Sequence, residues 1–292
     1  MGQKDGDKGE HGLGQSSVYD AFAGTAGYYA RYRFDYPVQI AQIIGSAFGL
    51  DGKGRLLDAG CGTGKLTFLL KPLFEQAVGV DRSAGMLTEA ERQAKSQGIT
   101  GIRWVVSPAE DAGADLGEFR LVSCGDAFHW MDRDKALTAW HGLLEQRGGL
   151  AVVGAGGGSA SGPEPWQVAM WEVIHRHLGP RRRNAEWQER TTKRHEEVIR
   201  ESGLFRLVSL GHVEHTGVRD FDSVLGFLYS TSFCNKSLLG DKVPRFEEDL
   251  RRSLLHVEPS GRFAEPLRAE YILAQPTPSS RARRLARPPA QC

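Results

Sequence analysis

Cysteine is scarce in this sequence, and no long hydrophobic run occurs in it. The four cysteines form no CxxC pair and no spacing typical of a metal site. They indicate free thiols in a reducing compartment and not a disulfide framework. No window approaches the roughly 18 uninterrupted apolar residues of a membrane-spanning helix. The first 16 residues also lack the apolar segment of a secretion signal. We therefore expect a cytoplasmic protein that does not enter a membrane.

An excess of charge of one sign is also missing. The chain has 37 Lys and Arg residues against 36 Asp and Glu residues, a formal net charge of +1. Bulk charge therefore gives no support to a nucleic-acid partner. Two local arginine clusters, at 181–183 and 281–287, are interpreted as a solvated loop or helix start and as part of a disordered tail.

The histidines do not form a pattern that would hold a metal ion. His175 and His177 are two residues apart on an expected helix, so their side chains leave from different faces. His212 and His215 are three residues apart in an expected strand and point to opposite faces. We expect no metal site.

What the sequence does contain is an alternation of short apolar runs and helical segments between about residues 50 and 156. The expected strands are 55–60, 77–81, 102–107, 120–128 and 150–156. Short apolar strands separated by helices are typical of a parallel sheet covered on both faces. Right-handed crossovers then make the sheet doubly wound.

The segments on either side of this region follow a different pattern. Residues 18–33 and 36–50 are expected helices, and Pro37 opens the second. Beyond residue 158 the regular alternation stops. Helices are expected at 166–179, 193–203, 221–233 and 244–257, and strands at 205–216 and 269–276. The C-terminal third is therefore expected to insert helices on either side of a sixth strand, which together with the N-terminal helices form a cap.

A glycine-rich loop follows the first expected strand and has the sequence Leu57-Asp58-Ala59-Gly60-Cys61-Gly62-Thr63-Gly64. Its glycines permit a tight turn and let a ligand approach the backbone closely at a helix N-terminus. The spacing matches neither the dinucleotide G-x-G-x-x-G nor a Walker loop. Taken alone, the glycine loop could equally be a structural turn that binds no ligand.

Asp81 ends the second expected strand, 17 residues after Gly64. An acidic residue at this position faces the ribose of a nucleotide bound across the first loop, where its oxygens accept hydroxyl protons. The alternative role is an N-cap for the following helix, which Ser83 could fill instead. Together with the glycine loop, Asp81 favours a nucleotide-type ligand.

The run LLDAGCGTGKLT followed by AVGVDRSAGML resembles the class I S-adenosylmethionine (SAM)-dependent methyltransferases. The segments YYARYRFDYP and DAFHWMD resemble the methyltransferase-11 type of small-molecule enzymes, including relatives of trans-aconitate methyltransferase. The resemblance covers residues 17–156 well and residues 195–275 loosely.

The resemblance implies an α/β fold. It would be a Rossmann-like, doubly wound, mostly parallel seven-stranded sheet with a helical N-terminal lid and C-terminal cap insertions. The expected division is a disordered tail at 1–16, a helical lid at 17–49, a SAM-binding core at 50–158, helical cap insertions around the sixth strand at 159–265, the last core strand at 266–276 and a disordered tail at 277–292.

Cofactor contacts follow from the same resemblance. It implies that Asp58 lies near the methionine amino group of SAM and that Gly60 and Gly62 line the methionine moiety. Asp81 would hold the ribose, and Met86 would pack on the adenine.

Four further cofactor contacts are implied beyond this set. Ala109 and Glu110 would lie at the adenine edge. The family often has Gly-Asp-Ala where this chain has Ser107-Pro108-Ala109, so Glu110 or Asp111 would supply the acidic contact. Tyr29 and Arg33 match a segment that closes over the cofactor. Arg33 either pairs with the SAM carboxylate or is a surface arginine.

The element Phe128-His129-Trp130 follows the fourth strand, at the edge where doubly wound folds bind ligands. The resemblance implies that Phe128 belongs to the cofactor wall. His129 is the candidate catalytic residue, because an imidazole pKa near 6.5 suits a general base. Alternatively it only hydrogen-bonds the substrate or the loop, which we favour. Trp130, Trp166 and Tyr229 are the candidate substrate contacts, although aromatic residues at helical spacing are more often core.

We therefore interpret the chain as an enzyme that transfers a methyl group from SAM to an oxygen or nitrogen of a small-molecule acceptor and releases S-adenosylhomocysteine. Natural-product biosynthesis is the expected setting, and proximity and orientation are the expected source of catalysis. Three alternatives stay open: C-methylation of a small molecule, an NAD-dependent oxidoreductase, which the glycine spacing disfavours, and a non-catalytic SAM-binding module. The sequence predicts neither the identity of the acceptor nor the oligomeric state.

Overall fold

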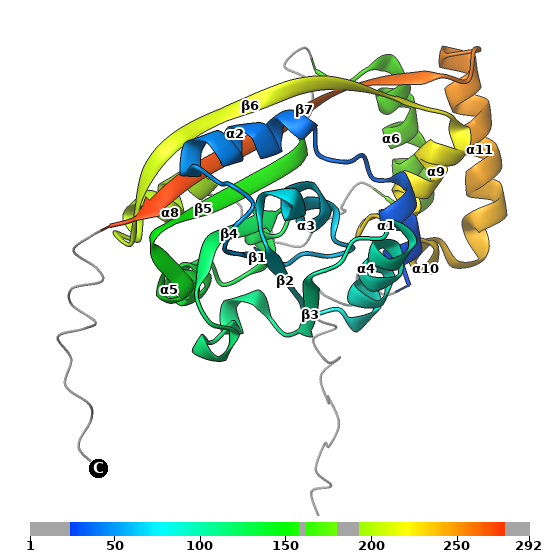
Figure 1. The fold of residues 1–292 in the computed structure, drawn as a ribbon. Helices are drawn as coiled ribbons and strands as arrows, with labels where there is room; N and C mark the ends of the chain where they lie inside the picture. The colour runs from blue at the N-terminus through cyan, green and yellow to red at the C-terminus, as the bar shows by residue number, and fades with distance from the viewer. Residues whose placement is uncertain (1–23, 158–161, 180–192, 278–292) are drawn as a thin grey trace, which may run out of the picture.

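The computed structural model describes residues 24–157, 162–179 and 193–277 of the 292-residue chain. Seven strands form one sheet in this part of the chain, in the order β3-β2-β1-β4-β5-β7-β6 (Figure 1). They are β1 (Arg55–Ala59), β2 (Gln76–Asp81), β3 (Ile102–Val106), β4 (Phe119–Gly125), β5 (Leu144–Gly157), β6 (Phe205–Arg219) and β7 (Phe263–Pro276). The expected tail at 1–16, the arginine cluster at 181–183 and all of the expected tail at 277–292 except Thr277 lie outside the described residues.

The first five strands pair in parallel, and β7 is antiparallel to both β5 and β6. The predicted mostly parallel, doubly wound sheet is therefore confirmed. Its central strands are buried on both faces, which is why they carry continuous apolar runs and not alternating ones. Leu56 and Leu57 of β1, for example, point to opposite faces and are both fully buried.

Helices cover both faces of the sheet. In the first half of the chain they are α1 (Ala26–Tyr32), α2 (Val38–Phe48), α3 (Lys65–Leu70), α4 (Ala84–Ser96) and α5 (Arg133–Leu143). Local signals set their ends: Pro37 is the N-cap of α2, and Gly49 ends it with φ of 58°. Helix α2 packs on the sheet, because Ile40 and Ile44 are fully buried in the cluster that contains Leu56.

Three predicted boundaries between β4 and β5 were wrong. The run DKALTAWHGLLEQRGG at residues 134–149 predicts a helix. The helix instead ends at Leu143, and β5 begins at Leu144 and not at residue 150. Leu144 is extended and pairs with Phe119, and both side chains are fully buried. Burial in the sheet therefore outweighs the local helical pattern. Strand β4 ends at Gly125, before the expected residue 128, and Phe128–Trp130 forms a 3-10 turn.

The C-terminal third contributes α6 (Pro165–Leu178), α8 (His195–Glu201), α9 (Phe221–Tyr229), α10 (Lys236–Leu239) and α11 (Val243–Val257). Helices α6, α9 and α11 lie together beyond one end of the sheet (Figure 1). They share an apolar core of their own, which includes Trp166, Phe246 and Phe263. None of the helices in the described ranges is long and apolar enough to cross a membrane.

Candidate cofactor and acceptor site

The glycine loop joins β1 to α3 at the carboxyl edge of the sheet. Gly60, Gly62 and Gly64 all have positive φ, at 70°, 53° and 86°, a region that other residues rarely adopt. A Cβ at Gly60 would lie 2.7 Å from the Cβ of Ala127, so a side chain there would collide with the loop after β4. A Cβ at Gly62 would meet nothing within 4 Å. Gly62 therefore leaves open space beside the backbone.

Asp81 pins this loop from the end of β2. Its Oδ2 accepts a 2.9 Å hydrogen bond from the backbone amide of Gly62, and its Oδ1 accepts one of 2.8 Å from that of Ser83. Burial raises the pKa of Asp81 above its usual value, and the two amides partly offset this. Ser83 caps α4 by accepting from the amide of Met86, so the N-cap role considered for Asp81 belongs to Ser83.

Asp58 is a fully buried carboxylate beneath the loop. It accepts hydrogen bonds from Thr67 Oγ1 at 2.5 Å and Ser123 Oγ at 2.7 Å. Burial raises the pKa of Asp58 to about 6, against the lowering effect of these two hydroxyls. The carboxylate thus joins α3 and β4 to β1 immediately below the ligand edge.

One cavity of about 130 Å³, here called the cofactor cavity, brings together most of the predicted cofactor contacts. It is lined by Tyr29, Gly60, Gly62, Asp81, Arg82, Ser83, Met86, Ala109, Glu110, Gly125, Asp126, Ala127, Trp130 and Met131. Apolar side chains, among them Met86 and Met131, form walls beside the carboxylate of Asp81. The sequence left open whether Glu110 or Asp111 supplies the acidic contact at the adenine edge. Of the two, Glu110 lines this cavity.

A second cavity of about 110 Å³, here called the polar cavity, shares Tyr29, Gly60, Gly62 and the 125–126 segment with the first. Asp58 and Arg33 line it, together with His215, which was considered only as a metal ligand. Four further lining residues had no signal in the sequence: Tyr36, Arg219, Phe227 and Glu265. Asp126 was also missed, although its position directly after β4 was a signal. Asp126 has φ of 50°, in the left-handed region, and its carboxylate accepts from the amide of Ala155 at 2.9 Å.

Arg33 is half-buried and contacts a residue from the C-terminal third of the chain. Its Nε donates to Ser230 Oγ at 2.9 Å. Its guanidinium lies 5.1 Å from the ring centre of Tyr29 and 4.9 Å from that of Phe227. Burial raises the pKa of Tyr29 to about 12, so this phenol is neutral over the cofactor cavity.

Phe128 and His129 face a third and larger cavity of about 650 Å³, away from the cofactor cavity that Trp130 lines. Phe128 is almost completely buried there and packs edge-on against His195, at 5.1 Å between ring centres. The His129 ring is nearly parallel to that of His195, with centres 6.2 Å apart. The 3-10 turn therefore divides the Phe-His-Trp element between two cavities.

Two predicted substrate contacts lie in the core of the cap and line none of these three cavities. Trp166 Nε1 donates to the carbonyl of Ala264 at 2.7 Å, and Tyr229 Oη donates to Glu247 at 2.7 Å. Each aromatic ring is buried, and its polar atom is satisfied within the protein. The structure thus gives both residues a packing role in the cap, and their contact with an acceptor stays a prediction.

Residues 56–148 match the model of a methyltransferase domain family. CRG1 of Saccharomyces cerevisiae, named a probable S-adenosylmethionine-dependent methyltransferase, is 30% identical over 126 residues, 42% of this chain and 43% of that protein. An uncharacterized methyltransferase of Schizosaccharomyces pombe is 29% identical over 126 residues, 43% of this chain and 48% of that protein. The chain spans less than half the length of these curated relatives.

A solved structure shares the fold at lower identity. A protein assigned as a type II methyltransferase from Anaeromyxobacter dehalogenans is 19% identical, with a TM-score of 0.57 over 83% of this chain and 97% of that one. At this identity the likeness concerns the fold alone. Residues 56–148 thus match a methyltransferase domain, and the chain shares its fold with a solved methyltransferase structure.

Proposed function

We propose that the protein transfers the methyl group of SAM to an oxygen or nitrogen of a small-molecule acceptor, in natural-product biosynthesis and in the cytoplasm. The observation that carries the proposal is the junction of two cavities at the carboxyl edge of the sheet. One has the residues suited to an adenosine, and the other is polar and adjoins it across Gly60 and Gly62. Ligands bind at this edge in doubly wound folds.

The residues present fit SAM. Each carboxylate oxygen of Asp81 accepts one backbone amide and keeps capacity for a ribose hydroxyl. Met86 and Ala109 offer apolar contact to a flat base. Within the described ranges, the hydroxyl of Thr63 in the glycine loop is buried and has no hydrogen-bond partner. Such a group favours a polar ligand at the loop.

SAM, when bound, supplies a methyl group activated by its sulfonium. The task that remains for the chain is to position the acceptor and exclude water, which can contribute about 7–11 kcal/mol to the barrier reduction. Tyr29 lines both cavities and Arg33 lines the polar cavity, so both are suited to that enclosure. A general base is needed only for a hydroxyl acceptor.

The polar cavity supports a small polar acceptor. It carries cationic Arg33 and Arg219 together with the carboxylates of Asp126 and Glu265. Its volume of about 110 Å³ is suited to a small reacting group. The net charge of +1 gives no general attraction for nucleic acid.

Two measurements test the proposal. Calorimetry with S-adenosylhomocysteine should give specific binding, whereas NADH should not bind. A screen of hydroxyl and amine compounds with SAM should then give a product heavier by one methyl group, and NMR of that product locates the methyl on O, N or C. Binding of NADH alone, or SAM binding without turnover of any compound class, would contradict the proposal. A methyl found on carbon would correct the acceptor atom.

A further inference from the structure

Arg219 ends β6 and is buried, with 3% of its side chain exposed. Its Nε donates to Glu265 Oε2 on β7 at 2.5 Å, and its Nη1 donates to the backbone carbonyl of Tyr32 at 2.8 Å. Glu265 is itself only 12% exposed. One guanidinium therefore joins the edge strand β6 and its neighbour β7 to the last residue of α1, which is 187 positions away in the chain.

Two aromatic rings complete the surroundings of this guanidinium. Its central carbon lies 4.0 Å from the ring centre of Phe34 and 4.5 Å from that of Phe227. Cation–π contacts of this kind are stronger where water is excluded. A planar guanidinium can stack and donate several hydrogen bonds at once, which an ammonium cannot do.

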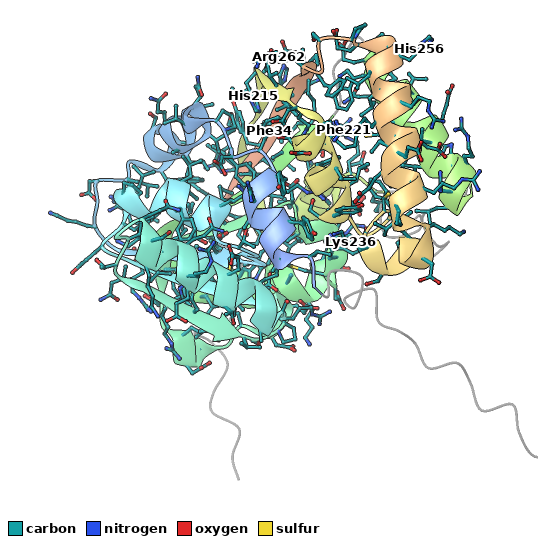
Figure 2. The ribbon with its side chains drawn as sticks, turned by 90° about the vertical axis from the view of Figure 1, so that its right-hand side faces the viewer. Phe34, His215, Phe221, Lys236, His256 and Arg262 are labelled. Carbon is teal, nitrogen blue, oxygen red and sulfur yellow. The ribbon has the colours of Figure 1, made fainter. Side chains whose placement is uncertain are left out.

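Two glycines make room for the rings of the N-terminal segment. A Cβ at Gly217 on β6 would lie 2.3 Å from Cζ of Phe34, and a Cβ at Gly226 on α9 would lie 2.2 Å from Cδ2 of Tyr32. Any side chain at either position would displace a ring. Figure 2 shows Phe34 beside His215, where the N-terminal segment meets β6 and α9.

The segment held in this way carries two residues of the ligand cavities, Tyr29 on α1 and Arg33 just after it. We propose that Arg219 is a positioning residue: it fixes residues 32–34 on β6 and α9, and so sets Tyr29 and Arg33 over the cofactor. The inference rests on the proposed function for its effect on ligand binding, but not for the contact itself. Removal of Arg219 would leave Glu265 buried without its cation, so the segment would separate from the sheet edge.

The experiment compares the full chain with Arg219→Met, Arg219→Lys and Gly217→Ala. Gly217→Ala keeps the ion pair but displaces Phe34, so it tests the segment even if Arg219→Met fails to fold. Arg206→Gln is the matched control, because Arg206 is exposed on the same strand and its side chain hydrogen-bonds Gln275, away from residues 32–34. Hydrogen exchange of residues 26–36 without ligand and the Kd for S-adenosylhomocysteine are the two readouts.

Arg219→Met and Gly217→Ala should speed exchange in residues 26–36 while β5 and β7 stay protected. The Kd should rise about tenfold, as for loss of a hydrogen bond to a charged group. Arg219→Lys should recover part of both effects, and Arg206→Gln should change neither. Unchanged exchange and Kd in a folded Arg219→Met variant would overturn the inference, as would loosening spread over the whole sheet. A parent protein that fails to bind S-adenosylhomocysteine would instead remove the proposed function, and exchange would still decide the role of Arg219.

Discussion

The hydroxyl of Tyr36 donates a 2.9 Å hydrogen bond to Oδ2 of Asp126, which links the segment before α2 to the carboxyl end of β4. Asp126 is held at a φ of 50° between the two ligand cavities. Burial raises the pKa of Asp126, and the Tyr36 hydroxyl partly offsets this rise. The pair therefore supports the backbone turn on which both cavities depend.

Tyr36→Phe should lower the free energy of unfolding by about 1–3 kcal/mol, because it leaves a buried carboxylate with one donor fewer. Urea unfolding measures this change. Tyr271→Phe is the control, since the Tyr271 hydroxyl has no hydrogen-bond partner among the described residues. Equal stability of the two variants would show that the Tyr36 bond contributes nothing.

Asp81→Asn should weaken binding of S-adenosylhomocysteine by about 1–3 kcal/mol, because an amide offers only one acceptor oxygen to the ribose and the loop. The remaining oxygen still accepts one backbone amide, so the fold should persist. Calorimetry on the variant and on exposed Asp115→Asn makes the comparison. An unaltered affinity in folded Asp81→Asn would remove this residue from the ribose site.

Asp58 should make the protein less stable as the pH rises. Its folded pKa of about 6 lies above the ordinary 3.8, so the folded state holds the proton more tightly than the unfolded chain does. Stability from this group is complete below about pH 4 and falls by about 3 kcal/mol as the pH rises to about 6. Asp58→Asn should lack this fall. Denaturant unfolding across that pH range measures the fall in the free energy of unfolding. The same pH dependence in the parent and in Asp58→Asn would contradict the prediction.

His129→Ala should leave binding of S-adenosylhomocysteine unchanged, because the His129 side chain faces the larger cavity beside His195. We expect kcat to fall by less than about tenfold, short of the 10²–10⁴-fold usual for loss of a general base. The check is the pH dependence of kcat, measured with the first acceptor that the compound screen identifies. A larger loss together with the disappearance of an acid limb near the imidazole pKa would instead identify His129 as the base.

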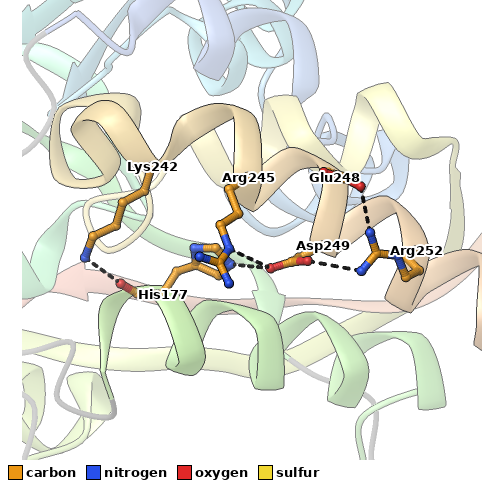
Figure 3. Close-up of polar contacts among 6 residues, drawn as sticks. All are labelled: His177, Lys242, Arg245, Glu248, Asp249 and Arg252. Carbon is orange, nitrogen blue, oxygen red and sulfur yellow. Dashed lines mark hydrogen bonds and ion pairs between the residues drawn. The ribbon is translucent and has the colours of Figure 1, made fainter.

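His177 on α6 contacts Asp249 on α11 at 2.9 Å between Nε2 and Oδ2, and Arg245 and Arg252 also face this carboxylate (Figure 3). The hydrogen bond from His177 lowers the pKa of Asp249 below its usual 3.8. The His177–Asp249 contact therefore stabilises the fold above that pH, and this stabilisation is lost as the pH falls below it. Asp249→Asn should lower the unfolding midpoint at about pH 6, and the difference from the parent should shrink at about pH 3. A difference that does not change with pH would contradict this assignment.

The candidate site divides between what was predictable and what was not. Gly60, Gly62, Asp81, Met86 and Glu110 lie within a few residues of strand ends, and the parallel topology brings those ends to one edge. Their meeting in one cavity followed from the order of elements. Arg219 and Glu265 lie on β6 and β7. No local sequence pattern indicates which strands these two pair with, so the position of both residues beside Arg33 was not predictable.

The sequence by itself determined the strands, the glycine turn and the doubly wound sheet, because apolar runs, caps and positive-φ glycines act over a few residues. Only the tertiary structure decided which side of the Phe128–Trp130 turn each side chain takes, and that Trp166 and Tyr229 belong to the cap core. It also decided that Phe34 packs where Gly217 has no side chain. These outcomes depend on close packing between segments far apart in the chain, and that packing has no counterpart in a local pattern.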